Sequence, residues 1–152
     1  MIEAIFKSCK IKKEIVIKDE KEKSLRMILN FGHTFAHGFE GANNFSRNLN
    51  HGEAVLLGMF VASELSCIRK ILSPKDLDLI RKHYSDLNLI KNIKKYFNKN
   101  KIKKIIYFMK KDKKNTNEKI NLILLKKIGR TTKPKEISLS ENEVKKFILS
   151  YF

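Results

Sequence analysis

The sequence predicts a mainly α-helical fold with one small β-hairpin, on three observations. Apolar residues recur at helical spacing between residues 25 and 40, and two later segments carry helix start signals. Two runs of β-branched and large apolar residues, 105–109 and 120–125, flank a polar turn, which is typical of a hairpin. With 152 residues, of which 42% are hydrophobic, the chain can bury one core, so residues 1–152 are predicted to form a single domain.

The first elements are predicted from apolar spacing. Residues 1–16 are expected to be the end of a helix that leads into a turn. From Leu25 to Glu40 the apolar positions predict one continuous helix, and the Gly, Asn and Ser residues of 41–50 predict a loop.

The segment 51–70 is predicted to be the next helix. Its small residues Ala54, Gly58 and Ala62 fall at every fourth position, so they share one helix face. Another stretch of backbone can approach closely along that face.

Two helices have clear start signals. In the first, Ser73 is the expected N-cap, Pro74 takes the first helical position and Asp76 lies in the first turn. In the second, Ser140 and Glu143 have the spacing of a capping box, which predicts a helix at the C-terminal end of the chain.

The formal charge of +17 comes from 33 Lys and Arg against 16 Asp and Glu. Such an excess is compatible with a nucleic-acid or acidic-membrane partner. Nearly all of it is lysine, however, whereas surfaces that read bases or clamp phosphates favour the planar guanidinium of arginine. Lys, Ile and Asn are abundant together, which favours a solvated basic surface over a nucleic-acid site.

Cysteine usage and hydropathy bound the cellular context. Cys9 and Cys67 are too few for a disulfide framework, which fits a reducing compartment. No apolar stretch is expected to approach the roughly 18 residues that span a bilayer, and the N-terminus lacks signal-peptide features. The expected location is cytoplasmic, without a membrane partner.

Four polar residues would share one face of the predicted helix 25–40. At about 100° per residue, Arg26, Asn30, His33 and His37 fall within roughly 60° of one another. Each is of a type that binds an anion, donates an amide hydrogen bond or ligates a metal. An ordinary solvent-facing stripe in this lysine-rich chain would carry Lys, Glu or Ser instead.

The remaining histidines decide how this pair is interpreted. An isolated H-x-x-x-H pair is more often two surface or core histidines than a ligand set. Here His51 also stands at a helix N-terminus, where the helix dipole disfavours imidazolium and keeps the ring available as a ligand. His83, on a polar helical stretch, is interpreted as a surface residue.

A catalytic zinc ion usually takes three protein ligands and keeps one position open. The sequence offers His33, His51 and, as a third possibility, His37. The nearest carboxylates are Glu40 and Glu53, and neither is predicted to be the third ligand. The predicted set of metal ligands therefore lacks one of the three that a catalytic zinc ion usually takes.

These residues fall in a longer pattern that resembles the C-terminal half of 3-dehydroquinate synthase. The pattern continues past the helices through DKK at 112–114 and ILLKKIGR at 123–130. One departure is local: Ala36 and Gly38 stand where the family commonly has Gly and Ala. The main motifs are K-x(6)-D-E-x-E-x-x-x-R-x-x-L-N-x-G-H-T-x-x-H from Lys12 to His37 and H-G-E-A-V-x-x-G-M from His51 to Met59.

The resemblance implies the helical C-terminal domain of a dehydroquinate synthase-like fold and a phosphate-eliminating lyase of the shikimate pathway. Such an enzyme uses zinc and NAD to convert 3-deoxy-arabino-heptulosonate 7-phosphate into 3-dehydroquinate and phosphate. By the resemblance, His33 and His51 are zinc ligands. Their metal ion would polarise the substrate hydroxyl for hydride transfer to NAD.

The same resemblance implies substrate-binding and catalytic residues. Lys12 and Arg26 would hold the anionic groups of the substrate, and Asn30 and His37 would contact its phosphate region. Lys113 would add positive charge there. Without the resemblance, Lys12 and Lys113 would be interpreted as surface lysines.

The larger departure concerns the cofactor. The sequence has no G-x-G-x-x-G phosphate cradle, whereas the family carries an N-terminal NAD-binding domain, followed by a glutamate that is the third zinc ligand. We therefore expect a C-terminal part of the enzyme that is inactive without its N-terminal half, with a homodimer as the expected assembly.

Two alternatives stay open from the sequence. One is another sugar-phosphate cyclase, such as a 2-epi-5-epi-valiolone or 2-deoxy-scyllo-inosose synthase, which Arg26 and Lys12 weakly disfavour because they suit a substrate with a carboxylate. The other is a non-catalytic basic helical module that binds nucleic acid or a partner protein. That module would account for the charge but not for the histidines.

Overall fold

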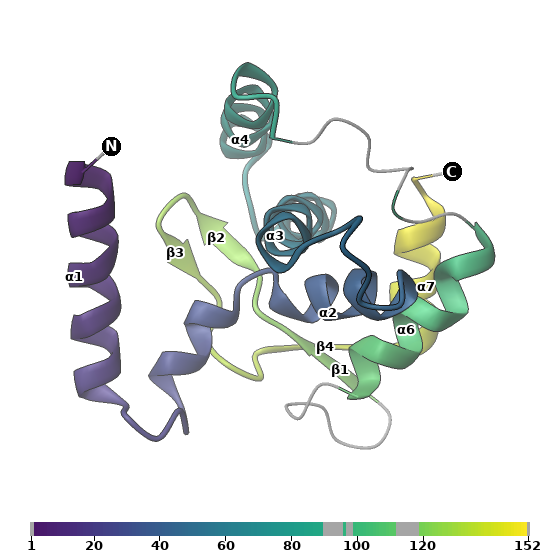
Figure 1. The fold of residues 1–152 in the computed structure, drawn as a ribbon, viewed down its shortest axis with the longest axis horizontal. Coiled ribbons are helices and arrows are strands. Elements are labelled where there is room, and N and C mark those ends of the chain that lie inside the picture. Colours follow the sequence, from purple (N-terminus) through teal and green to yellow (C-terminus); the bar gives the residue numbers. More distant parts are fainter. Residues whose placement is uncertain (1, 90–95, 97–98, 112–118, 152) are drawn as a thin grey trace.

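The computed structural model describes residues 2–89, 96, 99–111 and 119–151. Helices dominate this part of the chain, and two short antiparallel strand pairs accompany them (Figure 1). The elements are α1 (Ile2–Lys18), η1 (Leu25–Asn30), α2 (His33–Ala42), α3 (His51–Ile68), α4 (Pro74–Asp86), η2 (Lys99–Lys101), α6 (Ile102–Lys111), β1 (Lys119–Leu122), β2 (Leu125–Lys127), β3 (Arg130–Thr131), β4 (Ile137–Ser140) and α7 (Glu141–Leu149).

The core forms around α2, which lies between α3 and α6. Glycines let these helices come close. An added Cβ at Gly58 of α3 would lie 2.2 Å from the carbonyl oxygen of Gly32, and one at Gly41 would overlap the ring of Phe108 on α6. The face of small residues predicted on α3 is thus the place where the backbone of another segment packs. The largest fully buried side chains include Phe35, Phe39, Ile105, Met109, Ile120, Leu124, Leu139 and Ile148.

The predicted continuous helix over residues 25–40 is wrong. Residues 25–30 form the 3-10 helix η1, the chain turns at Phe31, and α2 begins at His33 after Gly32 adopts a φ of 83°. Glycine reaches this left-handed conformation without a steric cost. A side chain at position 32 would also clash with Met59, because the added Cβ would lie 2.5 Å from the backbone nitrogen of Met59.

The predicted β-hairpin between 105–109 and 120–125 is also misplaced. Residues 105–109 belong to α6, because Ile102, Ile105, Ile106 and Met109 follow helical spacing and bury one face. The hairpin that forms joins β2 to β3 instead, and β1 pairs with β4, Lys119 opposite Ser140. The polar turn of the prediction lies largely outside the described residues.

The predicted helix caps are present. The side chain of Ser73 accepts a hydrogen bond from the backbone nitrogen of Asp76 at the start of α4. Ser140 and Glu143 form a reciprocal capping box at α7, and Asn50 and Glu53 form a second one at α3. The last box was not predicted from the sequence, and it fixes the start of α3 at His51.

One helix among the described residues, α3, is long and apolar enough to cross a membrane by length and composition alone, with 18 residues and a mean hydropathy of 1.2. The expectation that no stretch approaches this length is therefore wrong. In the fold, 44% of the helix is buried, and its Ala54, Leu57 and Val61 belong to the core. Core helices of soluble proteins pass the same test.

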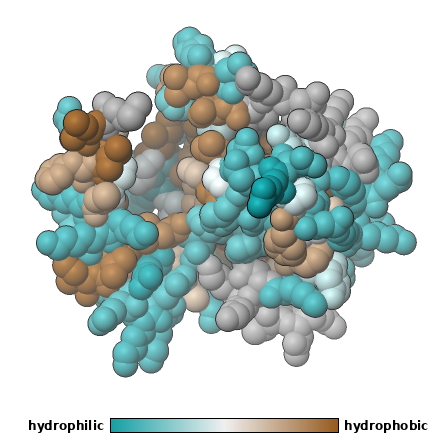
Figure 2. All heavy atoms as spheres, viewed as in Figure 1, coloured by the Kyte–Doolittle hydropathy of each residue, from teal (hydrophilic) through white to brown (hydrophobic). Residues whose placement is uncertain are grey.

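Helix α1 lies at one side of the molecule and has no buried residue (Figure 1). Hydrophobic side chains gather over it, at the left of Figure 2. It extends two residues beyond the predicted helix end at residue 16. Its large exposed hydrophobic residues are Ile2, Ile5, Phe6, Ile11 and Ile17.

Candidate metal and substrate site

Two helix N-termini bring three histidines together. His33 opens α2 and His37 follows one turn later, while His51 opens α3. The ring centroids of His33 and His51 lie 5.8 Å apart, and His37 lies 6.4 Å from His33 and 6.5 Å from His51. His83 is exposed on α4, as expected of a surface residue.

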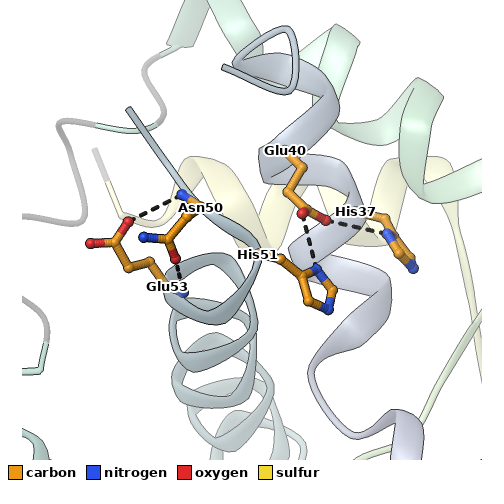
Figure 3. A network of polar contacts seen from close by, with 5 residues as sticks. All are labelled: His37, Glu40, Asn50, His51 and Glu53. Atoms are coloured by element: carbon orange, nitrogen blue, oxygen red, sulfur yellow. Dashed lines mark hydrogen bonds and ion pairs between the residues drawn. The ribbon is translucent and has the colours of Figure 1, made fainter. Parts of the chain in front are cut away.

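A carboxylate links two of these rings (Figure 3). Oε1 of Glu40 lies 3.0 Å from Nδ1 of His51, and its Oε2 lies 3.4 Å from Nδ1 of His37. The side chain of Glu40 is 12% exposed, whereas those of His37 and His51 are 43% and 61% exposed. The carboxylate therefore lies beneath the two imidazoles, which reach solvent.

The acceptor near each Nδ1 determines what the ring can do. Nδ1 of His33 lies 3.4 Å from the carbonyl oxygen of Phe31, and a carbonyl can only accept a hydrogen bond. A neutral ring that donates from Nδ1 keeps a lone pair on Nε2, which is the state that ligates a metal. All three rings have an oxygen acceptor close to Nδ1.

The spacing of His33 and His51 fits one shared metal ion. With metal–nitrogen distances of about 2.0–2.1 Å and tetrahedral angles, two imidazole centroids lie roughly 5 Å apart. The observed 5.8 Å is close to this value. Within the described part of the chain, no group of three or more His, Cys, Asp or Glu side chains is arranged to hold a metal, so the pair supplies an incomplete donor set.

Arg26 and Asn30 do not join the histidines on a single helix. They lie on η1, before the turn at Phe31, so the predicted shared face is wrong. The Arg26 guanidinium donates to the carbonyl oxygen of Glu20 at 2.7 Å, and Asn30 donates to Glu22 at 2.7 Å.

A carboxylate organises the segment before η1. Asp19 accepts hydrogen bonds from the backbone nitrogens of Lys23, Ser24 and Arg26, at 2.8–2.9 Å. These bonds, that from Arg26 foremost, lower the pKa of the Asp19 carboxyl below its usual value. The acidic residues of this segment thus hold the loop that leads into η1.

The structure gives no support for the two lysines of the predicted site, each for a different reason. Lys12 is exposed on α1. Lys113 lies outside the described residues. The geometry of the described residues therefore gives no support for a role of Lys12 or Lys113 in the site.

An apolar groove of about 540 Å³ lies next to the histidines. His33 lines it, and α1 contributes Ile11 and Ile15 as one wall. Arg130, at the start of β3, adds a guanidinium that sequence reasoning did not single out. The wall opposite α1 includes Val55, Met59, Ile80, Tyr84, Leu125 and Ile128.

The sequence indicates Glu40 as a nearby carboxylate but does not predict its contacts with His37 and His51. Its spacing of three residues from His37 was a visible signal, because such residues are neighbours on a helix. The contact with His51 could not be seen in the sequence, since it depends on how α2 packs against α3.

Comparison with known proteins relates the chain to one enzyme family. The family model described as "3-dehydroquinate synthase C-terminal" matches residues 1–115. The 3-dehydroquinate synthase of Pelagibacter ubique (strain HTCC1062) is 54% identical over 126 residues, which are 83% of this chain and 34% of that protein. That of Campylobacter fetus subsp. fetus (strain 82-40) is 39% identical over 125 residues, 82% and 35% of the two chains. The chain thus spans about a third of the length of these relatives.

Two solved structures of 2-deoxy-scyllo-inosose synthase share the fold. One, complexed with carbaglucose-6-phosphate, NAD+ and Co2+, has a TM-score of 0.68 at 20% identity and matches 84% of this chain and 35% of that chain. The other has a TM-score of 0.72 at 19% identity and matches 89% and 36%. These likenesses confirm the predicted mainly helical fold of the dehydroquinate synthase type.

Proposed function

The chain belongs to the 3-dehydroquinate synthase C-terminal family, and from that premise we propose that it is the metal- and substrate-binding part of 3-dehydroquinate synthase. The complete enzyme would be a phosphate-eliminating lyase of the shikimate pathway. It would convert 3-deoxy-arabino-heptulosonate 7-phosphate into 3-dehydroquinate and phosphate, in the cytoplasm.

The pairing of His33 and His51 is the observation that carries this proposal. The two rings come from different helices, lie 5.8 Å apart, and each has an oxygen acceptor near Nδ1. A divalent metal ion, zinc in this proposal, would supply Lewis acidity that polarises a substrate hydroxyl.

The remaining site residues would bind the substrate and handle protons. Arg26 uses one guanidinium donor on the carbonyl of Glu20, and a guanidinium has five N–H donors in all. Together with Lys12 and Lys113, it would offset the negative charge of the substrate carboxylate and phosphate. His37 and Asn30 would contact the phosphate region, with His37 as the group that can hold or release a proton at Nε2.

The proposal requires a second part of the enzyme. The chain spans about a third of its curated relatives, and the described residues supply two metal-binding nitrogens rather than three donors. An N-terminal NAD-binding half would bring the cofactor and the third ligand. We expect the single domain of residues 1–152 to be inactive alone and the assembled enzyme to be a homodimer.

Metal binding tests the proposal most directly. Titration of the purified chain with Co2+, followed by visible absorption, should show binding that His33→Ala and His51→Ala each weaken by at least about tenfold. His83→Ala, an exposed histidine on α4, is the matched control and should bind like the wild type. Equal Co2+ affinity in all four proteins would contradict the proposal.

Activity should then appear only after complementation. Adding an N-terminal NAD-binding half from a close relative, with NAD and zinc, should give phosphate release from 3-deoxy-arabino-heptulosonate 7-phosphate. Turnover by the chain alone would refute the expected dependence on that half.

One alternative is another sugar-phosphate cyclase, because both matched structures are of 2-deoxy-scyllo-inosose synthase. Turnover of the complemented enzyme on a substrate without a carboxylate, in preference to the heptulosonate, would favour it. The charge of +17 keeps a nucleic-acid-binding module as the second alternative. Salt-sensitive DNA or RNA binding that survives loss of both His33 and His51 would favour that module.

A further inference from the structure

We propose that Glu40 is a positioning residue that fixes the tautomer and direction of two imidazoles at once, those of His37 and His51. This inference rests on the proposed function, because it explains how His51 would be held ready for a metal ion. Glu40 would act through the two rings and would touch neither metal nor substrate.

The contacts give each carboxylate oxygen one ring. Oε1 faces Nδ1 of His51 at 3.0 Å, and Oε2 faces Nδ1 of His37 at 3.4 Å (Figure 3). Within the described residues, these imidazoles are the ion-pair partners of Glu40. An ionised carboxylate only accepts hydrogen bonds, so its contact with each ring favours a proton on Nδ1. A neutral ring with its proton there keeps a lone pair on Nε2.

Glu40 is on the wrong side of the rings to be a ligand itself. It contacts Nδ1, whereas a metal ion bound by these neutral rings would sit at Nε2, across the ring. Carboxylates that support a ligating histidine in this way orient the ring and raise its basicity. The geometry therefore assigns Glu40 to orientation and leaves the third donor to another part of the enzyme.

The backbone around Glu40 holds the carboxylate in place. The backbone carbonyl oxygen of Glu40 accepts hydrogen bonds from the backbone nitrogens of Phe45 at 2.8 Å and Asn43 at 3.1 Å. The next residue, Gly41, packs so tightly against Phe108 that an added Cβ would lie 2.1 Å from that ring. The end of α2 is thus fixed by hydrogen bonds on one side and by packing on the other.

Histidine-specific 15N NMR of the metal-free chain at about pH 8 tests the inference without an activity assay. In the wild type we expect His37 and His51 as Nδ1–H tautomers. In Glu40→Gln, the amide oxygen can take the place of only one of the two carboxylate oxygens, and the NH2 group at the other position favours a lone pair on the Nδ1 that it faces. At least one of the two rings should therefore move to the Nε2–H form. His33, whose Nδ1 faces a backbone carbonyl, should stay unchanged.

Co2+ titration of the same proteins gives the second readout. Glu40→Gln should weaken Co2+ binding about 10–100-fold, the usual cost of losing a supporting acceptor. Glu53→Gln is the matched control, because Glu53 lies two residues from His51 but accepts a hydrogen bond from the backbone nitrogen of Asn50 (Figure 3). It should leave tautomers and affinity unchanged.

The outcomes separate this inference from the proposed function. If the tautomers do not respond to Glu40→Gln, the proposed role of Glu40 is wrong. It is also wrong if His37 and His51 are Nε2–H tautomers in the wild type, a result that does not depend on whether a variant folds. Tautomers that shift in Glu40→Gln while no protein binds Co2+ support that role and refute the metal site of the proposed function.

Discussion

Gly58→Ala is expected to force α2 and α3 apart and to disturb the histidine pair. The new Cβ would lie 2.2 Å from the carbonyl oxygen of Gly32 and 3.0 Å from the backbone nitrogen of Ala36. Carbon and oxygen in contact normally lie about 3.3 Å or more apart. Both obstacles are backbone atoms, so the helices must separate by roughly 1 Å.

The expected magnitude combines two opposing effects. Overfilling a packed contact costs about 1–3 kcal/mol. Alanine is better than glycine in a helix interior by about 0.5–1 kcal/mol. Taking the middle of each range, we expect a net loss of about 1 kcal/mol in the free energy of unfolding. Because metal donors tolerate displacements of only about 0.2 Å, Co2+ affinity should also fall by about tenfold or more.

Urea unfolding followed by circular dichroism and Co2+ titration measure the two effects. Gly52→Ala is the matched control on the same helix, since its nearest neighbour would be Oδ1 of Asn50 at an ordinary 3.8 Å. It should be as stable as the wild type or slightly more stable, with unchanged Co2+ affinity. If Gly58→Ala behaves like Gly52→Ala in both measurements, the close contact does not set the helix spacing.

Three further predictions concern stability, each measured by urea unfolding. Ser140→Ala removes the cap that accepts from Glu143 and should cost about 1 kcal/mol. Tyr151→Phe removes a hydroxyl that donates a hydrogen bond to a carboxylate of α3 and should cost about 1.5–3 kcal/mol; burial, and then this bond, raise the pKa of Tyr151. The pKa of Asp19 is lowered chiefly by the backbone of Arg26, so its contribution to stability is complete above the ordinary pKa of 3.8. The advantage of the wild type over Asp19→Asn should decline below pH 3.8 and vanish as pH falls through the lowered folded-state pKa.

Local signals in the sequence predicted much of the helical fold. The caps at Ser73 and Ser140 work within three residues, so they depend little on the rest of the chain. The helix that starts at His51 and the close approach along its small-residue face were also visible. These features follow from side chains that act on their own backbone or on one helix face.

The errors arose where tertiary packing overrides local pattern. Apolar spacing continues from η1 into α2, so the break at Gly32 could not be read from periodicity; the fit of that glycine against Met59 determines it. Residues 105–109 favour a strand by composition, but Gly38 and Gly41 of α2 give α6 a surface on which a helix packs. For the same reason, the sequence indicated His33, His51 and the nearby Glu40, but not the contact between the Glu40 carboxylate and His51.

The contact between Gly32 and Gly58 has a bearing on the unusual composition of the chain. Main-chain atoms alone set the separation of α2 and α3 there, without any intervening side chain. The lysines that dominate the formal charge of +17 take no part in this contact. The spacing of α2 and α3 at this point therefore does not depend on which side chains cover the surface of the molecule.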